Sequence, residues 1–336
     1  MTIRTDELKL TLVGCGAIAE SYYLPALAKR RRVIEALTLV DVDIDRARKL
    51  AAAFGLKKYF ADYRDVLDKT DGAIIALPIH LHHPISIEFL SRKIPVLCEK
   101  PLAESAPKAR EMVGLAQKSG VALATNYSQR LWPHFSKVKA IIESRALGEP
   151  ISIKYDIGEI FAWPTVSGFY FNSTGSARGI LRDRGAHVLD HICWWLGGKP
   201  SVVRCQNDSF GGSDAVADVH FKYGRCQGEV MLSWLSSFPC TFAIEFERGS
   251  IEGEVHYPQT LLVTERGQRK RIKLRSELYS DLGDKIVDNF IKVITENKKP
   301  LVSGGEVLDS IGFVDDCYAV ASRLEMPWYE IPEVNE

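Results

Sequence analysis

The chain has 336 residues, of which 46% are hydrophobic and 26% are charged, as in an ordinary soluble globular protein. Lys and Arg number 43, and so do Asp and Glu, so the formal net charge is zero and the chain as a whole does not attract nucleic acid or an anionic membrane. This composition argues against disordered, fibrous and strongly basic DNA-binding classes, and at about 150 residues per domain the length predicts two domains.

Cysteine usage and hydropathy bear on the compartment. The seven cysteines are an odd number and no two form a CxxC pair, which argues against a disulfide framework and against a structural zinc site. No apolar run reaches the roughly 18 residues of a membrane span. The first ten residues lack the apolar segment of a signal peptide. We therefore expect a cytoplasmic protein with no membrane partner.

The first 127 residues alternate short apolar runs with helix-forming segments. Strands are predicted at 8–16, 36–43, 72–78, 94–101 and 121–127, and helices at 45–55, 83–93 and 106–120. Nearly continuous apolar strands separated by helices predict a parallel sheet covered on both faces. Right-handed crossovers then give a doubly wound sheet of the Rossmann type, which we assign to a first domain at 1–127.

A glycine turn follows the first predicted strand. Gly14-Cys15-Gly16-Ala17-Ile18-Ala19 fits GxGxx[G/A], in which glycines let the backbone approach a pyrophosphate at a helix N-terminus. Asp41 ends the second strand, where an acid accepts hydrogen bonds from the adenosine ribose and repels a 2′-phosphate. The pattern predicts a dinucleotide site that prefers NAD. NADP stays open as the alternative, because Arg46 or Arg48 can reach a phosphate.

Two later strands of this domain also end in candidate site residues. Leu77-Pro78 ends the third predicted strand, and His82 follows this proline by four residues. Glu99-Lys100-Pro101 ends the next strand. Ligands of doubly wound sheets bind beyond the carboxyl ends of the strands, so Lys100 is expected beside a bound nicotinamide. A lysine there can donate a hydrogen bond to a substrate oxygen and stabilise developing negative charge.

The pattern changes after residue 128. Helices are predicted at 132–148, 185–198, 284–300 and 305–324, with a strand at 151–161 and alternating apolar and polar segments between 201 and 274. Such alternation predicts a mostly antiparallel, open sheet with one covered face. We assign 128–336 to a second α/β domain that binds substrate, whose closing helices can pack back on the first domain.

An acidic residue and a histidine mark the start of the helix near 185. Asp183 and His187 are four residues apart and share a face if this segment is helical. Histidine suits proton transfer because its reference pKa is ~6.5. The alternative is a helix-capping aspartate with a buried core histidine, and Asp190 is a possible partner of His187. His187 and His191 lack a third ligand, so we expect no metal site.

Several residues of lower specificity lie where they can reach a substrate. Asn126 and Arg130 follow the last strand of the first domain. Trp163 lies in an irregular stretch, where its ring can stack on a sugar face or pack under the loop. Arg182 and Arg184 flank the acidic residue of the Asp-His pair. They can recognise a carboxylate or phosphate of the substrate, or they are surface or subunit-contact arginines.

The motifs and their order resemble those of the Gfo/Idh/MocA oxidoreductases, a family named after glucose–fructose oxidoreductase and inositol dehydrogenase. That pattern is a glycine turn, P-x-x-x-H, E-K-P and D-x-x-x-H, which this chain carries at 14–19, 78–82, 99–101 and 183–187. The resemblance implies that Lys100 polarises the substrate oxygen, oriented by Glu99. It also implies that His187 is the general base, that Asp183 orients it or binds a neighbouring hydroxyl, and that His82 lies near the nicotinamide ribose.

The resemblance further implies a reaction class. It predicts hydride transfer between a nicotinamide cofactor, NAD or NADP, and a secondary alcohol or ketone of a small polyhydroxylated substrate, namely a sugar, cyclitol or sugar nucleotide. It implies a homodimer or homotetramer formed through the second sheet. Two alternatives within the family are an enzyme that retains NAD and cleaves a glycosidic bond by transient oxidation, and a sensor that binds the dinucleotide without catalysis. Intact Lys100, Asp183 and His187 argue against the sensor.

Overall fold

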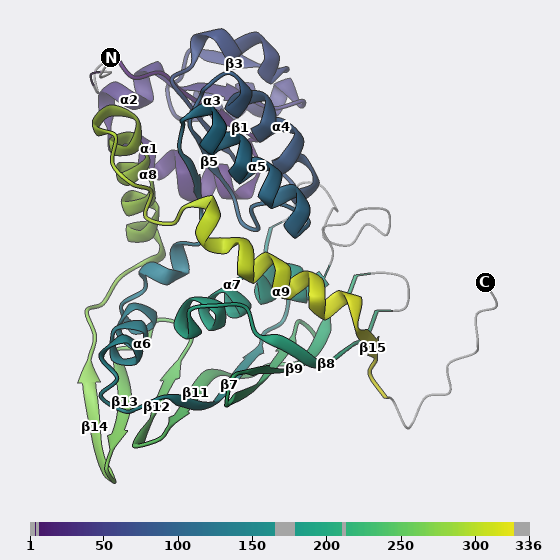
Figure 1. Ribbon diagram of the computed structural model, residues 1–336. Helices are drawn as coiled ribbons and strands as arrows, with labels where there is room; N and C mark the ends of the chain where they lie inside the picture. Colours follow the sequence, from purple (N-terminus) through teal and green to yellow (C-terminus); the bar gives the residue numbers. More distant parts are fainter. Residues whose placement is uncertain (1–3, 5–6, 165–178, 210–212, 326–336) are drawn as a thin grey trace, which may run out of the picture.

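The computed structural model describes residue 4 and residues 7–164, 179–209 and 213–325. Within these residues the protein has two sheets, each with its own covering helices (Figure 1). The first sheet uses the N-terminal part of the chain, and the second uses the rest. This two-part arrangement, a parallel sheet and a mostly antiparallel one, confirms the predicted fold class.

The first sheet is parallel throughout, with strand order β3-β2-β1-β4-β5-β6. Its strands are β1 (Leu10–Val13), β2 (Thr38–Val40), β3 (Lys58–Phe60), β4 (Gly72–Ile75), β5 (Val96–Cys98) and β6 (Leu123–Thr125). Every residue of β1 and β4 is buried, as continuous apolar runs require when both faces are covered. The strand order reverses at β1 and β4, which is the place where doubly wound sheets bind ligands.

Helices connect these strands on both sides of the sheet. A π-helix, Ala19–Tyr23, continues into α1 (Leu24–Ala28), and the others are α2 (Arg31–Ala36), α3 (Ile44–Ala53), α4 (Ile79–Ser91) and α5 (Ala106–Ser119). Helix α4 begins four residues before the predicted start at 83. Pro84 lies inside this helix rather than at its beginning, so His82 is helical. A seven-residue 3-10 helix, Tyr63–Lys69, precedes β4.

The second sheet is mixed, with strand order β14-β13-β12-β11-β7-β10-β9-β8-β15. Its strands are β7 (Pro150–Gly158), β8 (Ser201–Asn207), β9 (Val216–Tyr223), β10 (Cys226–Ser233), β11 (Phe238–Phe246), β12 (Gly249–Glu254), β13 (Thr260–Glu265), β14 (Gln268–Lys273) and β15 (Ala321–Arg323). In the described part of the chain its pairs are antiparallel except β7 with β10 and β8 with β15. Consequently β7, β10 and β12 run in the same direction, because β11 is antiparallel to both β7 and β12.

Helices cover one face of this sheet, the face toward the first sheet (Figure 1). They are α6 (Pro133–Ser144), α7 (Gly179–Leu196) and α9 (Leu308–Ala319). The opposite face carries ion pairs such as Lys154 Nζ with Glu229 Oε1 at 3.0 Å. Helix α7 begins six residues before the predicted start at 185, so Asp183 is helical. None of the described helices is both long enough and apolar enough to cross a membrane.

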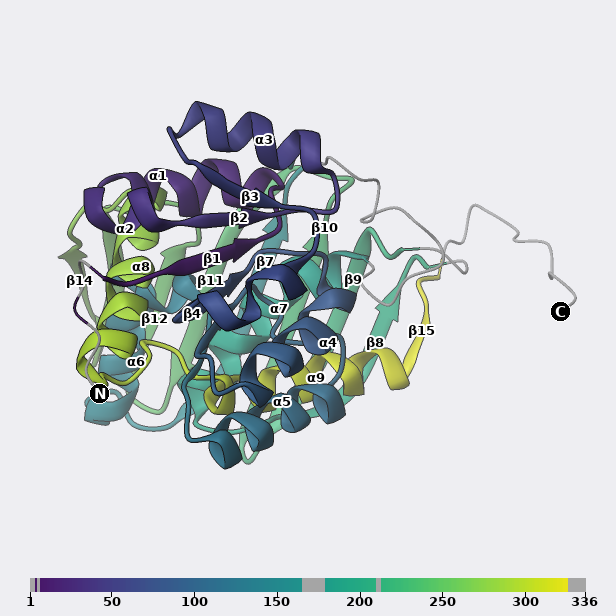
Figure 2. The same cartoon turned by 90° about the horizontal axis from the view of Figure 1, so that it is seen from above.

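The last two helices join the two parts of the molecule. Figures 1 and 2 show α8 (Tyr279–Glu296) beside α1. Arg30 Nε lies 2.7 Å from Asp288 Oδ1, and Lys29 Nζ lies 2.5 Å from Asp284 Oδ2. Helix α9 packs on α5, whose Ala106 N–H donates to Asp315 Oδ2 at 2.7 Å. These contacts fix the second sheet against the carboxyl edge of the first.

Candidate active site

A cavity of about 1170 Å³ lies at the carboxyl edge of the first sheet. It is lined by most of the residues predicted from the sequence: Gly14, Gly16, Ala17, Ile18, Asp41, Leu77, Pro78, Glu99, Lys100, Asn126, Trp163, Arg182, Asp183, Arg184 and His187. Cys15, His82 and Arg130 do not line it. Residues that follow β1, β2, β4, β5 and β6 therefore meet at one edge of the sheet, as their strand-end positions predict.

The glycine turn needs glycine at its first position. Gly14 has φ +100°, and a Cβ there would lie 2.2 Å from the carbonyl oxygen of Ala76. Cys15 contributes only its backbone N–H, which donates to Asp41 Oδ2 at 2.8 Å. Its side chain is buried, and this burial raises the pKa of the thiol to about 12. The turn thus offers backbone rather than a cysteine side chain to a ligand.

The carboxylate of Asp41 is held in place by two backbone N–H groups. Its Oδ2 accepts from Cys15, and its Oδ1 accepts from the N–H of Asp43 at 2.9 Å. Arg46 lines the cavity, 3.7 Å from Asp41 Oδ2 and 3.2 Å from Asp43 Oδ2. Arg48 instead pairs with Asp45 on the exposed side of α3. Of the two arginines predicted to reach a phosphate, Arg46 is the one at the cavity.

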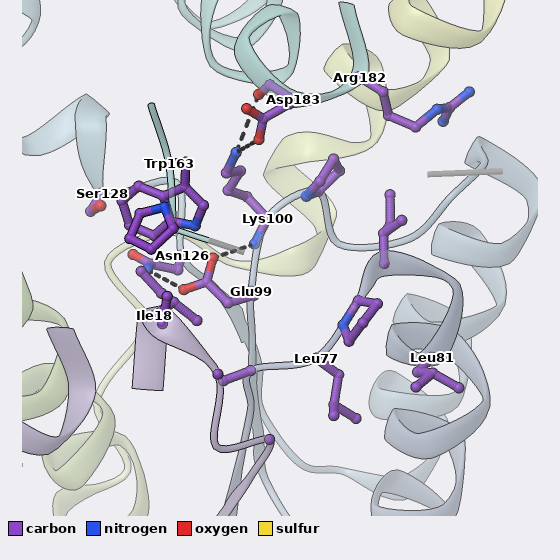
Figure 3. Close-up of a pocket in the computed structure, with 18 of the residues that line it drawn as sticks. Ile18, Leu77, Leu81, Glu99, Lys100, Asn126, Ser128, Trp163, Arg182 and Asp183 are labelled. Atoms are coloured by element: carbon purple, nitrogen blue, oxygen red, sulfur yellow. Dashed lines mark hydrogen bonds and ion pairs between the residues drawn. The ribbon is translucent and has the colours of Figure 1, made fainter. Parts of the chain in front are cut away.

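Lys100 and Asp183 form an ion pair across the cavity. Lys100 Nζ donates to Asp183 Oδ1 at 2.6 Å and to its carbonyl oxygen at 3.2 Å (Figure 3). This corrects the expected role of Asp183, whose carboxylate binds the ammonium and not His187. The pairing has a physical cause, since a largely buried ammonium needs a counter-charge more than a neutral imidazole does.

Glu99 fixes the backbone of this lysine. Its Oε1 accepts from Tyr23 Oη at 2.7 Å and from Asn126 Nδ2 at 2.6 Å, and its Oε2 accepts from the N–H of Lys100 at 3.1 Å. Burial raises the pKa of Glu99, and the bonds from Asn126 and Tyr23 oppose that rise. Glu99 therefore positions the Lys100 main chain, whereas orientation of the ammonium falls to Asp183.

His187 lies on α7 one turn after Asp183. Its Nδ1 is buried and has no hydrogen-bond partner among the described residues, so Nε2 is the nitrogen available to the cavity. Burial lowers the pKa of His187 well below its usual range, and the charge of Lys100 lowers it further. The imidazole is therefore neutral at physiological pH, the form that keeps a lone pair on one ring nitrogen.

Two residues predicted to contact ligand have structural roles instead. Arg130 is buried, and its Nε and Nη2 each lie 2.7 Å from an oxygen of Asp190. This bidentate ion pair engages Arg130, which was expected to bind substrate, and Asp190, which was expected to be a partner of His187. His82 is also buried, with Nδ1 2.8 Å from the carbonyl oxygen of Pro101 and Nε2 2.7 Å from that of Leu77. It joins the turns at Leu77 and Pro101, both of which line the cavity, and does not line the cavity itself.

His191 belongs to an aromatic core. Its Nδ1 is 3.1 Å from the hydroxyl of Tyr155, and its ring centroid is 3.9 Å from that of Phe135. The described ranges contain no group of three His, Cys, Asp or Glu side chains that could hold a metal ion.

The second sheet supplies wall residues that sequence reasoning missed. Glu159 follows β7, Trp234 follows β10, and His256 and Tyr257 follow β12, and all four line the cavity. These three strands are co-directional, so their carboxyl ends reach the same edge. Strand-end position was the available signal, but the directions of the strands were needed to use it. Tyr279 at the start of α8 completes this side.

The arginines beside Asp183 differ from each other. Arg184 Nε contacts Glu159 Oε1 inside the cavity. In Figure 3 Arg182 points away from Lys100 and Asp183. Its Nη1 donates to the carbonyl oxygen of Glu104 and lies 3.5 Å from Asp315 Oδ1. Arg182 thus anchors α7, although part of it lines the cavity rim.

Comparison with known proteins places the chain. A model described as "Oxidoreductase family, NAD-binding Rossmann fold" matches residues 8–127, and one described as "GFO/IDH/MocA C-terminal domain" matches residues 135–252. The chain belongs to the Gfo/Idh/MocA oxidoreductase family. The resemblance inferred from the motifs is thereby confirmed.

Relatives in this family carry sugar- and cyclitol-related names. An inositol 2-dehydrogenase from Arthrobacter is 29% identical over 60% of this chain and 57% of its own length. A glucose-6-phosphate 3-dehydrogenase from Bacillus subtilis is 27% identical over 56% of this chain and 53% of its own. The aligned part thus spans little more than half the length of either relative.

Solved structures show the same fold. An oxidoreductase from Agrobacterium radiobacter in complex with NAD+, L-tartaric acid and magnesium has a TM-score of 0.79 at 19% identity, covering 94% of this chain and 96% of that one. A 3-ketoreductase from Actinomadura kijaniata in complex with NADP and TDP-benzene has a TM-score of 0.81 at 19% identity, covering 95% and 99%. At such identities the likeness concerns the fold alone.

Proposed function

We propose that the protein is an NAD-dependent oxidoreductase that transfers a hydride between the nicotinamide and a secondary alcohol or ketone of a sugar-like substrate. The observation that carries this proposal is the ion pair of Lys100 and Asp183, 2.6 Å long, beside the neutral His187 at the carboxyl end of a Rossmann sheet. The relatives named inositol 2-dehydrogenase and glucose-6-phosphate 3-dehydrogenase support a polyhydroxylated ring as substrate.

The residues present fit a dinucleotide. Gly14 leaves no room for a Cβ, so backbone from β1 and β4 is closely packed where a pyrophosphate would bind. The N–H groups of Gly16, Ala17 and Ile18 and the ordered carboxylate of Asp41 would hold the pyrophosphate and the adenosine ribose. When bound, the nicotinamide accepts or returns the hydride.

The chain's own groups handle the proton and the oxygen. Lys100 donates a hydrogen bond to the reacting oxygen and stabilises negative charge on it, while Asp183 keeps the ammonium in position. His187 accepts the hydroxyl proton at Nε2 during oxidation and returns it during reduction. Glu99 holds the main chain of Lys100, and Asp183 holds its ammonium.

The preference for NAD rests on the rigidity of Asp41. Two backbone N–H groups fix its carboxylate, so it cannot turn away from the 2′-phosphate of NADP. Arg46 offsets part of this repulsion but is itself engaged by Asp41 and Asp43. We expect NADH to bind at least about tenfold more tightly than NADPH, since one unfavourable charge contact costs roughly 1.4 kcal/mol or more.

The test is a fluorescence titration of nucleotide-free protein with NADH and NADPH. Asp41→Ala should weaken NADH binding about tenfold and reduce the preference, because it removes a charge-assisted acceptor for the ribose. Asp45→Ala is the matched control, as this acid lies on exposed α3 and pairs with Arg48. If the protein binds neither nucleotide, the proposed function is wrong. If Asp41→Ala leaves the ratio unchanged, only the cofactor assignment is wrong.

A further inference from the structure

The wall formed by the second sheet contains a second ion pair, separate from Lys100 and Asp183. Arg184 Nε forms an ion pair with Glu159 Oε1, and His256 Nε2 lies 3.6 Å from Glu159 Oε2. The Glu159 side chain is 25% exposed, and the residue lines the same cavity as Lys100. Burial by itself would raise the pKa of Glu159, but His256 and Arg184 outweigh it and lower the pKa. Glu159 is therefore an ordered, ionised acceptor at neutral pH.

The cations at this end of the cavity already have carboxylate partners. Lys100 Nζ is 2.6 Å from Asp183, Arg184 contacts Glu159, and Arg182 Nη1 is 3.5 Å from Asp315. These three cations are the described lysine and arginine residues that line the cavity beside Glu159 and Asp183, and each is paired with a carboxylate. A phosphate or carboxylate on a substrate would thus meet compensated cations together with the negative charges of Glu159 and Asp183. Such a site disfavours an anion.

Aromatic rings line the same cavity as Glu159. Trp132 and Tyr257 contact edge to face with centroids 5.2 Å apart, and Phe161 and Trp234 do so at 4.8 Å. Trp163 is 40% exposed and lines the cavity. Rings of this kind bury the C–H face of an uncharged ring, while an ordered carboxylate accepts hydrogen bonds from its hydroxyl groups.

We propose that Glu159 is a specificity-determining residue that accepts hydrogen bonds from the hydroxyl groups of an uncharged polyol, and that this cavity selects against phosphorylated and carboxylated sugars. The inference rests on the proposed function and deepens it. It also separates this chain from its relative named glucose-6-phosphate 3-dehydrogenase. Arg184 and His256 act through Glu159 by keeping it ionised and oriented.

The experiment compares neutral probes with anionic counterparts. The probes are D-glucose and myo-inositol against D-glucose 6-phosphate and D-glucuronate, with NADH formation followed by absorbance. We expect the better neutral probe to have at least a tenfold higher kcat/KM than either anionic probe. Glu159→Gln should lower kcat/KM for the neutral probe about tenfold, mainly by raising KM. It should therefore also lower the ratio of kcat/KM for the neutral probe to that for the anionic probes.

Glu229→Gln is the matched control. Glu229 also pairs with a cation, Lys154 at 3.0 Å, but it lies on the opposite face of the second sheet and does not line the cavity. Its substitution should leave kcat/KM and the ratio of neutral to anionic probes unchanged. The change at Glu159 would then be a property of the site and not of losing any paired carboxylate.

Two further measurements separate the possible failures. NADH titration is independent of substrate, so protein that does not bind NADH counts against the proposed function. With normal NADH binding, a preference for D-glucose 6-phosphate or D-glucuronate overturns the inference, and so does an unchanged ratio in Glu159→Gln. If no probe is oxidised, the Tm of the NADH-bound protein is compared with each probe at equal concentration. Stabilisation by anionic probes only, or by none, also overturns the inference.

Discussion

The cavity has two walls, a first wall formed by the first sheet and a second wall formed by the second sheet, and they contribute different kinds of groups. The first sheet contributes backbone and buried side chains, such as the turn at Gly14, the fixed carboxylate of Asp41 and the enclosed Glu99. The second sheet contributes exposed side chains from the segments that follow its strands, such as Trp163 and Tyr257. Under the proposed function the first wall binds an unvarying dinucleotide and can be rigid. The second wall binds the substrate and can be altered without disturbing the core. Substitutions in the first wall should therefore abolish function or stability, and those in the second should change specificity.

The largest effect is expected at Lys100, where the two walls meet. Lys100→Ala removes the only ammonium that contacts Asp183 in the described structure. Under the proposed function it also removes the group that stabilises negative charge on the substrate oxygen. Turnover should fall about a thousandfold while NADH binding changes little. Steady-state NADH formation with the best probe gives the first quantity, and fluorescence titration gives the second.

Lys108→Ala is the control for this substitution. Lys108 lies on α5, where it contacts Glu104, and it does not line the cavity, so turnover should stay at the wild-type level. A Lys100→Ala protein with full turnover would contradict the catalytic assignment. Net formation of NADH by the wild type would also count against the alternative of a glycosidase that retains its cofactor.

A smaller effect is expected when the rigid wall is disturbed at Gly14. A methyl group there would lie 2.2 Å from the Ala76 carbonyl oxygen, and φ is +100°. Gly14→Ala should lower the free energy of unfolding by about 2–4 kcal/mol and abolish NADH binding, because β1 and β4 must separate. Urea unfolding and NADH titration measure these two results.

Gly55→Ala isolates the contribution of the backbone angle. Gly55 also has positive φ, +70°, but a Cβ there would meet no atom within 4 Å. Only the conformational cost of about 1 kcal/mol is expected, and NADH binding should be kept. Equal destabilisation of the two variants would mean that close packing against Ala76 does not define the turn.

The rigid wall was largely predictable from the sequence. Continuous apolar runs identified the strands that are buried on both faces, and strand-end positions then indicated the cavity residues. The edge strand β3 was missed because Lys58 and Tyr59 are exposed and form no apolar run. Arg130 was misplaced for another reason, since a strand-end position does not say whether a side chain turns to the cavity or to a buried acid such as Asp190.

The second wall could not be derived in the same way. Alternation of apolar and polar residues reveals the two faces of a sheet but not the direction of each strand, so Glu159 and His256 were not recognised as neighbours. Helical spacing placed Asp183 and His187 on one face correctly. It could not reveal that the Asp183 carboxylate pairs with Lys100, which is 83 residues away in the chain. Pairings of this kind depend on tertiary contacts.

The smallest effect concerns buried histidines in the second part of the molecule. His134, His187 and His191 are all buried, and burial lowers the pKa of each. The unfolded chain therefore binds more protons than the folded protein once the pH falls below about 6.5, and stability decreases as the pH falls. The first part of the molecule contributes one comparable group, His82, whose pKa burial lowers to about 4.

His134 offers the cleanest test, because burial lowers its pKa to about 3 and it does not line the cavity. Its ring lies 3.9 Å from that of Phe135, so phenylalanine can take its place among the aromatic rings at the cost of one hydrogen bond to Val255. His134→Phe should reduce the pH slope of the unfolding free energy between pH 6 and pH 4 by about 1.4 kcal/mol per pH unit. Urea unfolding at several pH values measures this slope. Phe242→Leu, in the same cluster, should lower stability equally at every pH, and an unchanged slope in His134→Phe would show that the folded protein protonates His134 as readily as the unfolded chain does.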